Sequence, residues 1–459
     1  MKKIFYIFLV FLISCSQTSQ SETSQASVDS SLDTPSTTST PSTTSTPTTI
    51  ASTPTTIASV APPSENESEK CAPVNTPTCD PQGNPIGEGG NNPQPTDNSV
   101  SNVDEISVTL STIVLGGGKN VRGAEGISLD INTGYMYIGL NGSIISGCEG
   151  DVSQGGQPVG GGELSIINPS LGKELYSVAT GGAPIWPTVD SDRGYVYVMG
   201  SGDGTVNIHN LSDGAKVSVI YVGGKPHQGG LHLSSGKLVI GNTFQSSDDI
   251  NQQKYSSIVN IESLKVEKDF ESSPGAHGMA VDQENNLVYF SSVGDGAVTV
   301  INILTNQIIN KVIPKSKYGD AFGGNNMLTR QNKTGRLFQV NTQPSATGLL
   351  VIDEKSLSLI DVIRFANNKI PWGLWVDEEQ ELLFAALPNA DSIGVVDLKI
   401  LKHVLNIKVG ECPYAVSVDT QRNVGVSSNQ GTPNINASAT VFDLCKVYEK
   451  VGRKSSKCP

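Results

Sequence analysis

From residue 105 onward, the chain consists of short runs of β-branched and aromatic residues separated by Gly, Asn and Asp. Short apolar runs bounded by turn-forming residues predict β-strands rather than helices. One pattern recurs within them, an apolar strand that ends at an aspartate, as in the sequence MAVD at residues 279–282. This pattern ends at Asp130, Asp190, His232, Asp282, Gln331, Asp377 and Asp419, of which His232 and Gln331 are weaker copies.

A second pattern, an apolar pair followed by Asn or Asp, also occurs seven times and sets the repeat length. Asp190 and Asn210 are 20 residues apart and Asn210 and His232 are 22 apart, so the basic unit has 42 residues. Such a unit holds four short strands, and seven units bury their sheet faces by packing against one another. The Asx side chains are expected to cap the following turns through backbone N–H groups. The second pattern ends at Asn168, Asn210, Asn260, Asn302, Asp353, Asp397 and Asp443.

The repeat unit resembles that of the YVTN family of seven-bladed β-propellers, which is close to the NHL and lactonase-type propellers. The resemblance is carried by residues 195–198 (YVYV), 287–290 (LVYF) and 204–208 (GTVNI). It implies an all-β fold, a seven-bladed β-propeller of four-stranded antiparallel blades, over residues 105–445. It does not select an activity, because such propellers include binders, sensors and enzymes.

The ring is expected to close by pairing the two ends of the repeat region. Residues 106–115 resemble the fourth strand of a blade and precede the first complete unit, so we predict that they pair with blade 7. Residues 446–451 are the rival for that place.

The N-terminus predicts export. Residues 4–13 form an apolar run of ten after a short basic start, too short to span about 30 Å of hydrocarbon and typical of a signal peptide. Residues 12–15 (LISC) resemble the lipobox of bacterial lipoproteins, which implies a signal peptide over residues 1–14 and a lipid anchor on Cys15. Ser16 after it implies sorting to the outer membrane or cell surface. The alternative is an ordinary secretory signal with Cys15 incidental.

Residues 15–104 have a different composition, with many Ser, Thr and Pro and no Phe, Trp or Tyr. Such a segment cannot bury enough apolar surface to offset the entropy of ordering its backbone. We therefore expect a disordered stalk there, and a C-terminal tail over residues 446–459.

Departures from the 42-residue spacing place insertions at residues 141–162, 245–254 and 315–325. All three fall between the second and third strands of a blade or between successive blades, and these connections share one face of a propeller. That face also holds the mouth of the central channel. The residues that begin the innermost strands there are Glu125, Ile185, His227, His277, Asn326, Trp372 and Tyr414.

A carboxylate, two imidazoles, an amide and aromatic rings around one opening are typical of a ligand pocket. His227 and His277 lie on adjacent blades. With Glu125 they form a candidate ligand set for a divalent metal such as Zn, Cu or Fe. The alternative is that the histidines only bond the backbone.

Tryptophans add a second chemistry to the mouth. Trp186 and Trp372 can stack on a sugar, an aromatic ring or a choline-like cation, or they can pack between blades. Trp375, inside an innermost strand, is expected in the core. The sequence holds no Gly-x-Ser-x-Gly, His-Glu-x-x-His, Walker or haem Cys-x-x-Cys-His motif.

Six cysteines remain after Cys15, an even number that fits an oxidising compartment. The candidate disulfides are Cys71–Cys79, Cys445–Cys458 and Cys148–Cys412. The last would join blades 1 and 7, which are neighbours across the ring closure.

The chain is acidic, with 31 Lys and Arg against 44 Asp and Glu and a formal net charge of −13. Without a basic stripe it is a poor nucleic-acid binder, because phosphate contacts supply most of that affinity. The sequence favours a monomeric, membrane-anchored propeller that binds a protein, glycan or other ligand on its insertion-rich face without catalysis. Two alternatives stay open, a metal-dependent lactonase-like hydrolase or lyase and a periplasmic electron-transfer or dehydrogenase-associated propeller.

Overall fold

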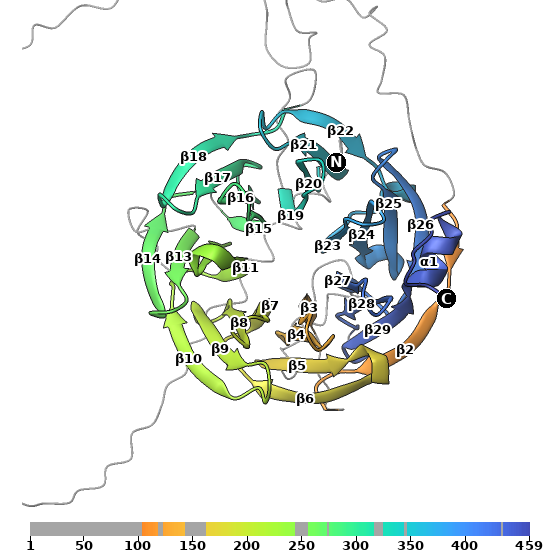
Figure 1. The fold of residues 1–459 in the computed structure, drawn as a ribbon, viewed down its shortest axis with the longest axis horizontal. Coiled ribbons are helices and arrows are strands. Elements are labelled where there is room, and N and C mark those ends of the chain that lie inside the picture. The colour runs from red at the N-terminus through yellow and green to blue at the C-terminus, as the bar shows by residue number, and fades with distance from the viewer. Residues whose placement is uncertain are drawn as a thin grey trace, which may run out of the picture. The chain divides into compact units, whose positions relative to one another are not determined.

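The computed structural model describes residues 103–117, 123–142, 162–243, 256–272, 275–315, 325–343, 347–432 and 435–459. These residues form seven sheets of four antiparallel strands, one of which gains a short fifth strand, placed side by side around a central axis (Figure 1). The predicted all-β, seven-bladed propeller is therefore confirmed. Among the residues described, no helix is both long and apolar enough to cross a membrane.

Blades 1 to 5 are meanders of consecutive strands, with the first strand of each nearest the axis (Figure 1). Blades 1, 2 and 3 contain β3 Ala124–Leu129, β4 Met136–Leu140, β5 Glu163–Asn168 and β6 Lys173–Ala179; β7 Pro184–Asp190, β8 Tyr195–Gly200, β9 Thr205–Asn210 and β10 Lys216–Tyr221; β11 Pro226–His232, β12 Lys237–Asn242, β13 Ser256–Asn260 and β14 Lys265–Phe270. Blades 4 and 5 contain β15 Ala276–Asp282, β16 Leu287–Ser292, β17 Val298–Asn302 and β18 Gln307–Val312; β19 Asn325–Gln331, β20 Arg336–Asn341, β21 Gly348–Asp353 and β22 Leu359–Ile363. Blades 6 and 7 contain β23 Leu374–Asp377, β24 Leu382–Leu387, β25 Ser392–Asp397 and β26 Lys402–Lys408; β27 Pro413–Asp419, β28 Val424–Asn429 and β29 Ser438–Asp443.

The outer strand of blade 7 comes from the other end of the ring. β2 (Thr109–Val114) pairs antiparallel with β29, with Thr109 opposite Phe442 and Val114 opposite Ser438. The predicted N-terminal closure is therefore confirmed, and the rival strand at residues 446–451 is wrong. Before β2, the two-residue strand β1 (Glu105–Ile106) pairs in parallel with β26, so the N-terminal segment contributes to blade 6 as well.

The middle strands of the blades are buried because the neighbouring blades cover both of their faces. Their largest side chains have almost no exposed surface, and the rings of Phe384 and Phe442 lie 6.3 Å apart, centroid to centroid, between blades 6 and 7. Burial of one such ring contributes about 2 kcal/mol to the free energy of unfolding. The blades therefore stabilise one another, as expected of repeats that cannot bury a sheet face alone.

The strand-ending aspartates cap the turns that follow them, as predicted. Asp190, which is fully buried, accepts a hydrogen bond on Oδ1 from the backbone N–H of Arg193 at 3.1 Å. Asp282 accepts bonds from the N–H groups of Glu284 and Asn285, each also at 3.1 Å. The recurrence of these residues in the sequence thus has a structural explanation.

The last residues form a helix where we expected an irregular tail. Helix α1 (Leu444–Lys450) starts directly after β29, with Asp443 Oδ1 accepting a bond from the N–H of Lys446 at 3.2 Å. Leu444, Val447 and Tyr448 are buried against blades 6 and 7. These three residues are spaced as on one face of a helix, so the pattern of residues 444–448 predicts a helix rather than a strand.

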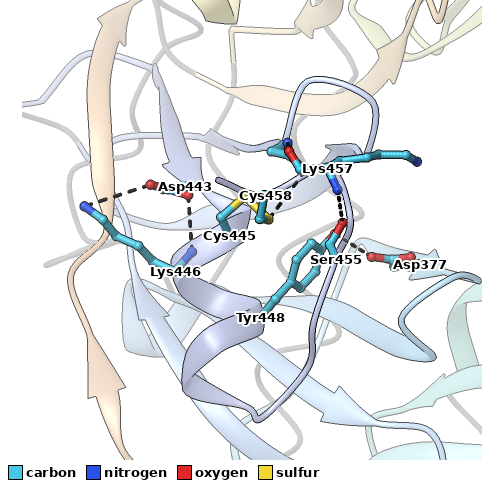
Figure 2. The surroundings of a disulfide bond; sticks show 9 residues. Asp377, Asp443, Cys445, Lys446, Tyr448, Ser455, Lys457 and Cys458 are labelled. Carbon is cyan, nitrogen blue, oxygen red and sulfur yellow. Dashed lines mark hydrogen bonds and ion pairs between the residues drawn. A yellow bond between two sulfur atoms is a disulfide. The ribbon is translucent and has the colours of Figure 1, made fainter.

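Contacts from the C-terminal segment tie blade 7 to blade 6. The disulfide Cys445–Cys458 joins the helix to the end of the chain (Figure 2). The hydroxyl of Tyr448 donates to Asp377 Oδ2 at 2.6 Å (Figure 2), and Arg453 Nη2 lies 2.7 Å from Asp397 Oδ1. Both aspartates belong to blade 6, so the segment braces the boundary beside the composite blade.

Candidate functional site

The predicted insertions fall in connections of the expected class. Residues 143–161 and 244–255 join the second and third strands of blades 1 and 3, and residues 316–324 join blade 4 to blade 5. In antiparallel meanders these connections lie at the face where the innermost strands begin. The three stretches themselves lie outside the described residues.

The innermost strands bring four of the predicted mouth residues into buried positions at that face. Glu125 lies in β3, His227 in β11, His277 in β15 and Tyr414 in β27, each 2–6% exposed. Trp372, before β23, is half-buried. Two further mouth residues behave differently, because Ile185 belongs to the hydrophobic core and the side chain of Asn326, in β19, lies outside the described residues.

His227 and His277 stack on each other across the boundary between blades 3 and 4. Their ring centroids are 3.5 Å apart with the planes inclined by 32°. Burial lowers the pKa of His227 to about 3, and burial together with the neighbouring imidazole lowers the pKa of His277 well below its usual range. Both rings are therefore uncharged at neutral pH, and neither Nδ1 atom has a hydrogen-bond partner among the described residues.

Glu125 is a carboxylic acid at neutral pH rather than a carboxylate. Burial raises its pKa to about 8, although the side-chain amide of Asn141 donates a hydrogen bond to Oε1 and acts in the opposite direction. Asn141 follows β4 at the same face. Among the described residues, the mouth therefore contains four ionisable groups, Glu125, His227, His277 and Tyr414, and they carry almost no charge.

Aromatic rings from neighbouring blades surround this carboxyl. The centroid of Tyr414 lies 5.4 Å from that of Trp372 and 6.5 Å from that of Trp186. Trp186 also lies 6.5 Å from His227, so the rings form a continuous belt from blade 4 to blade 6 by way of blades 3, 2 and 7. Burial, together with the charge of the Glu125 carboxyl, raises the pKa of Tyr414 well above its usual range.

A glycine makes room for one of these rings. A Cβ atom on Gly126 would lie only 2.4 Å from Cδ2 of Trp186, so the indole rests directly on the backbone of β3 beside Glu125. Sequence reasoning missed Gly126 and Asn141. Glycine inside an apolar strand is a known sign of close approach and could have suggested the first of them.

The donor atoms of the candidate metal ligands do not converge on one point. Zinc binds imidazole nitrogen and carboxylate oxygen at about 2.0–2.2 Å, with the donor atoms converging on one point. The rings of His227 and His277 lie face on face instead, and no three His, Cys, Asp or Glu side chains in the described part of the chain are grouped to hold a metal ion. Glu125 has its hydrogen bond with Asn141.

The opposite opening of the channel has a different character. A cavity of about 300 Å³ lies there between blades 6, 7 and 1, lined by Leu129, Val376 and Val418 and by acidic side chains of the capped turns. Trp375, expected in the core, is half-buried and also lines this cavity. Asp377 and Asp419, on its wall, are already bonded to the hydroxyl of Tyr448 and the guanidinium of Arg422.

The cysteines support one predicted disulfide directly. Cys445 and Cys458 are bonded, as expected. Cys412 is buried and is also part of a disulfide. Its predicted partner Cys148 lies outside the described residues, as do Cys71, Cys79 and the candidate lipidation site Cys15, so these pairings and the anchor stay predictions.

Comparisons with known proteins support the architecture. The chain matches no protein-family model, and no curated protein is similar to it in sequence. Its structure is similar to that of Kuenenia stuttgartiensis hydrazine synthase, with a TM-score of 0.50 and 12% sequence identity, over 71% of this chain and 96% of that one. At this identity the likeness shows the propeller fold alone.

Proposed function

We propose that this protein is a binding propeller, which takes a small organic ligand at the channel mouth on its insertion-rich face and carries out no chemistry of its own. The observation that supports the proposal best is the pair of Nδ1 atoms of His227 and His277, buried and without partners beside a belt of aromatic rings. Buried polar atoms normally have hydrogen-bond partners, so such atoms at an opening point to a bound molecule.

The protonation states fit binding better than catalysis. A general base works best with a pKa near the operating pH, whereas the imidazoles of His227 and His277 have pKa values lowered far below it. Glu125 contacts an amide rather than a nucleophile or a second carboxylate. No specific observation favours the metal-dependent hydrolase or lyase, or the electron-transfer propeller.

Anchoring belongs to the proposal as well. We infer attachment to the outer membrane or cell surface through a lipid on Cys15, supported by the apolar run before it and the Ser and Thr-rich stretch after it. Labelling of the expressed chain with radioactive palmitate tests this. Label that disappears in Cys15→Ala supports the anchor, and label-free wild-type protein contradicts it.

The binding function is tested by ligand-induced thermal stabilisation of the full chain, screened against small amines, sugars and aromatic acids. A ligand of the mouth should raise the melting temperature of the wild type and of Trp375→Ala, but not of Trp372→Ala. The two tryptophans are three residues apart, but Trp372 precedes β23 at the mouth whereas Trp375, inside β23, lines the cavity at the opposite opening, so Trp375→Ala is a matched control. A screen in which no compound distinguishes the two variants would contradict the proposal.

A further inference from the structure

The mouth holds one carboxyl group, that of Glu125, and no positively charged partner for it among the described residues. The groups that face Glu125 are the amide of Asn141, the ring of Tyr414 from β27 and the hydroxyl of Ser428 from β28, which donates to the backbone carbonyl of Glu125. None of these groups carries a charge at neutral pH. The acid is therefore kept neutral by burial and not by a built-in cation.

The surroundings of that acid are suited to a positive charge. Aromatic faces attract cations placed within about 6 Å of the ring centroid, most strongly when water is excluded. The ring of Tyr414 lies between the two indoles, 5.4 Å from Trp372 and 6.5 Å from Trp186, and the ring of Trp372 is only half-buried and so keeps an open surface. A carboxyl and a row of two indoles and a phenol at one opening supply the groups from which a cage for an ammonium ion is built.

We propose that the ligand of this mouth is a small organic cation with a quaternary or methylated ammonium group, held by Trp186, Trp372 and Tyr414 and by the carboxylate of Glu125. This inference rests on the binding function proposed above and names its ligand class. A sugar is a poorer match, because its several hydroxyls need hydrogen-bond partners, whereas the described residues of the mouth supply mainly aromatic faces around one carboxyl.

Binding of a cation must change the protonation of the acid. Glu125 enters the complex as a carboxylate, so its O–H bond breaks and the proton passes to solvent while the ammonium ion takes its place. One proton is released per cation bound, and no other reactant is needed. Below the pKa of the free acid, affinity should therefore rise about tenfold per pH unit.

The experiment is isothermal titration of the full chain with choline and with 3,3-dimethylbutan-1-ol, its uncharged carbon isostere, between pH 6 and 9. Choline should bind at least about tenfold more tightly than the isostere at pH 8. Its affinity should rise with pH up to about 8 and then level off, with about one proton released per site at pH 7.

Variants separate the carboxyl from the rings. Glu125→Gln should lose the pH dependence for choline and weaken its binding at pH 8 about tenfold, without changing the isostere. Trp372→Ala should weaken both compounds, and Trp375→Ala neither. Equal affinity for choline and the isostere, or choline binding that does not depend on pH, would overturn the cation while leaving a ligand-binding mouth in place. Absence of choline binding at every pH would also overturn it, and the ligand screen would then decide the broader function separately.

Discussion

Buried acidic side chains have different partners at the two openings of the channel. At the end where the innermost strands finish, Asp190, Asp282 and Asp419 are 0–3% exposed, and backbone N–H groups and arginines bond them. At the end where those strands begin, Glu125 is equally buried and remains protonated. The three aspartates have hydrogen-bond and ion-pair partners within the fold, whereas Glu125 is uncharged because burial raises its pKa.

This difference separates structural acids from candidate functional ones. A buried charge is tolerated when it is paired and hydrogen-bonded, and breaking such a pair is costly. A buried group that is left neutral and poorly partnered contributes little to the fold, so its presence needs another reason. Substitutions at the two openings should therefore have unequal effects on stability and on binding.

The largest expected effect is that of Asp282→Asn. Asn keeps the size of the side chain and one acceptor oxygen, but removes the charge that lies 2.9 Å from Arg330 Nη2. Arg330 is 9% exposed and would keep only Glu354 as a charged partner. We expect the free energy of unfolding to fall by about 3 kcal/mol at pH 7, as measured by urea denaturation.

The matched control is Glu125→Gln, the same exchange of carboxyl for amide at the other opening. Glu125 is largely uncharged at pH 7, so this change should cost less than about 1 kcal/mol. Equal losses in the two variants would contradict the distinction between the openings.

The second effect is a pH dependence that belongs to the mouth. The pKa of Glu125 is about 8 in the folded state against an ordinary 4.5, so the folded state keeps a proton that the unfolded chain releases. Stability from this group is complete below pH 4.5 and is lost as the pH rises through 8, by about 2 kcal/mol between pH 6 and 8. The free energy of unfolding of the wild type should therefore fall between pH 6 and 8 relative to that of Glu125→Gln, which lacks the titrating group. Parallel changes in the two proteins would contradict this prediction.

A third, smaller effect concerns the bond from the C-terminal helix to the opposite opening. Tyr448→Phe removes only the hydroxyl that donates to Asp377 at 2.6 Å, and Asp377 keeps its bonds from the N–H groups of Glu379 and Gln380. We expect a loss of about 2 kcal/mol in the free energy of unfolding, since the hydroxyl bonds an acidic side chain and both partners are buried. Tyr221→Phe, on an exposed outer strand, is the control and should change nothing measurable.

The smallest effect is expected from an exposed bond between blades at the same end. Asn132 Nδ2 donates to the carbonyl of Ser191 at 3.1 Å, in contact with solvent. Asn132→Ala should reduce the free energy of unfolding by about 0.5 kcal/mol, because water replaces most of this bond. A loss as large as that of Tyr448→Phe would show that burial does not decide what these bonds contribute.

Much of the fold could be predicted from the sequence because the repeat is local. Aspartates such as Asp190 and Asp282 recur because each caps the turn directly after its own strand. The hydrogen bond joins residues only three positions apart in the chain. The count of blades and the closure by residues 106–115 followed from this spacing. Helix α1 was missed because its seven residues follow a strand immediately, although Leu444, Val447 and Tyr448 already show a helical stripe.

Less of the candidate site could be predicted, because its properties arise between blades. The sequence places His227 and His277 at equivalent positions, but it does not say that their rings stack at 3.5 Å rather than converge on a metal ion. The high pKa of Glu125 depends on burial by distant segments, and β1 is a two-residue strand with no periodicity to detect. Contacts between units, unlike capped turns, leave no regular spacing in the chain.

The composite blade has a consequence for how the protein is made. β2 precedes every complete blade, whereas its partner β29 follows all the other strands of the described ring, so the ring stays open until β29 has been translated. A chain that stops before residue 438 leaves β2 without its partner strand and blade 7 with an exposed edge, which is a feature that promotes aggregation. Closure of the ring therefore depends on a single strand pair, and truncated chains that lack it are expected to aggregate.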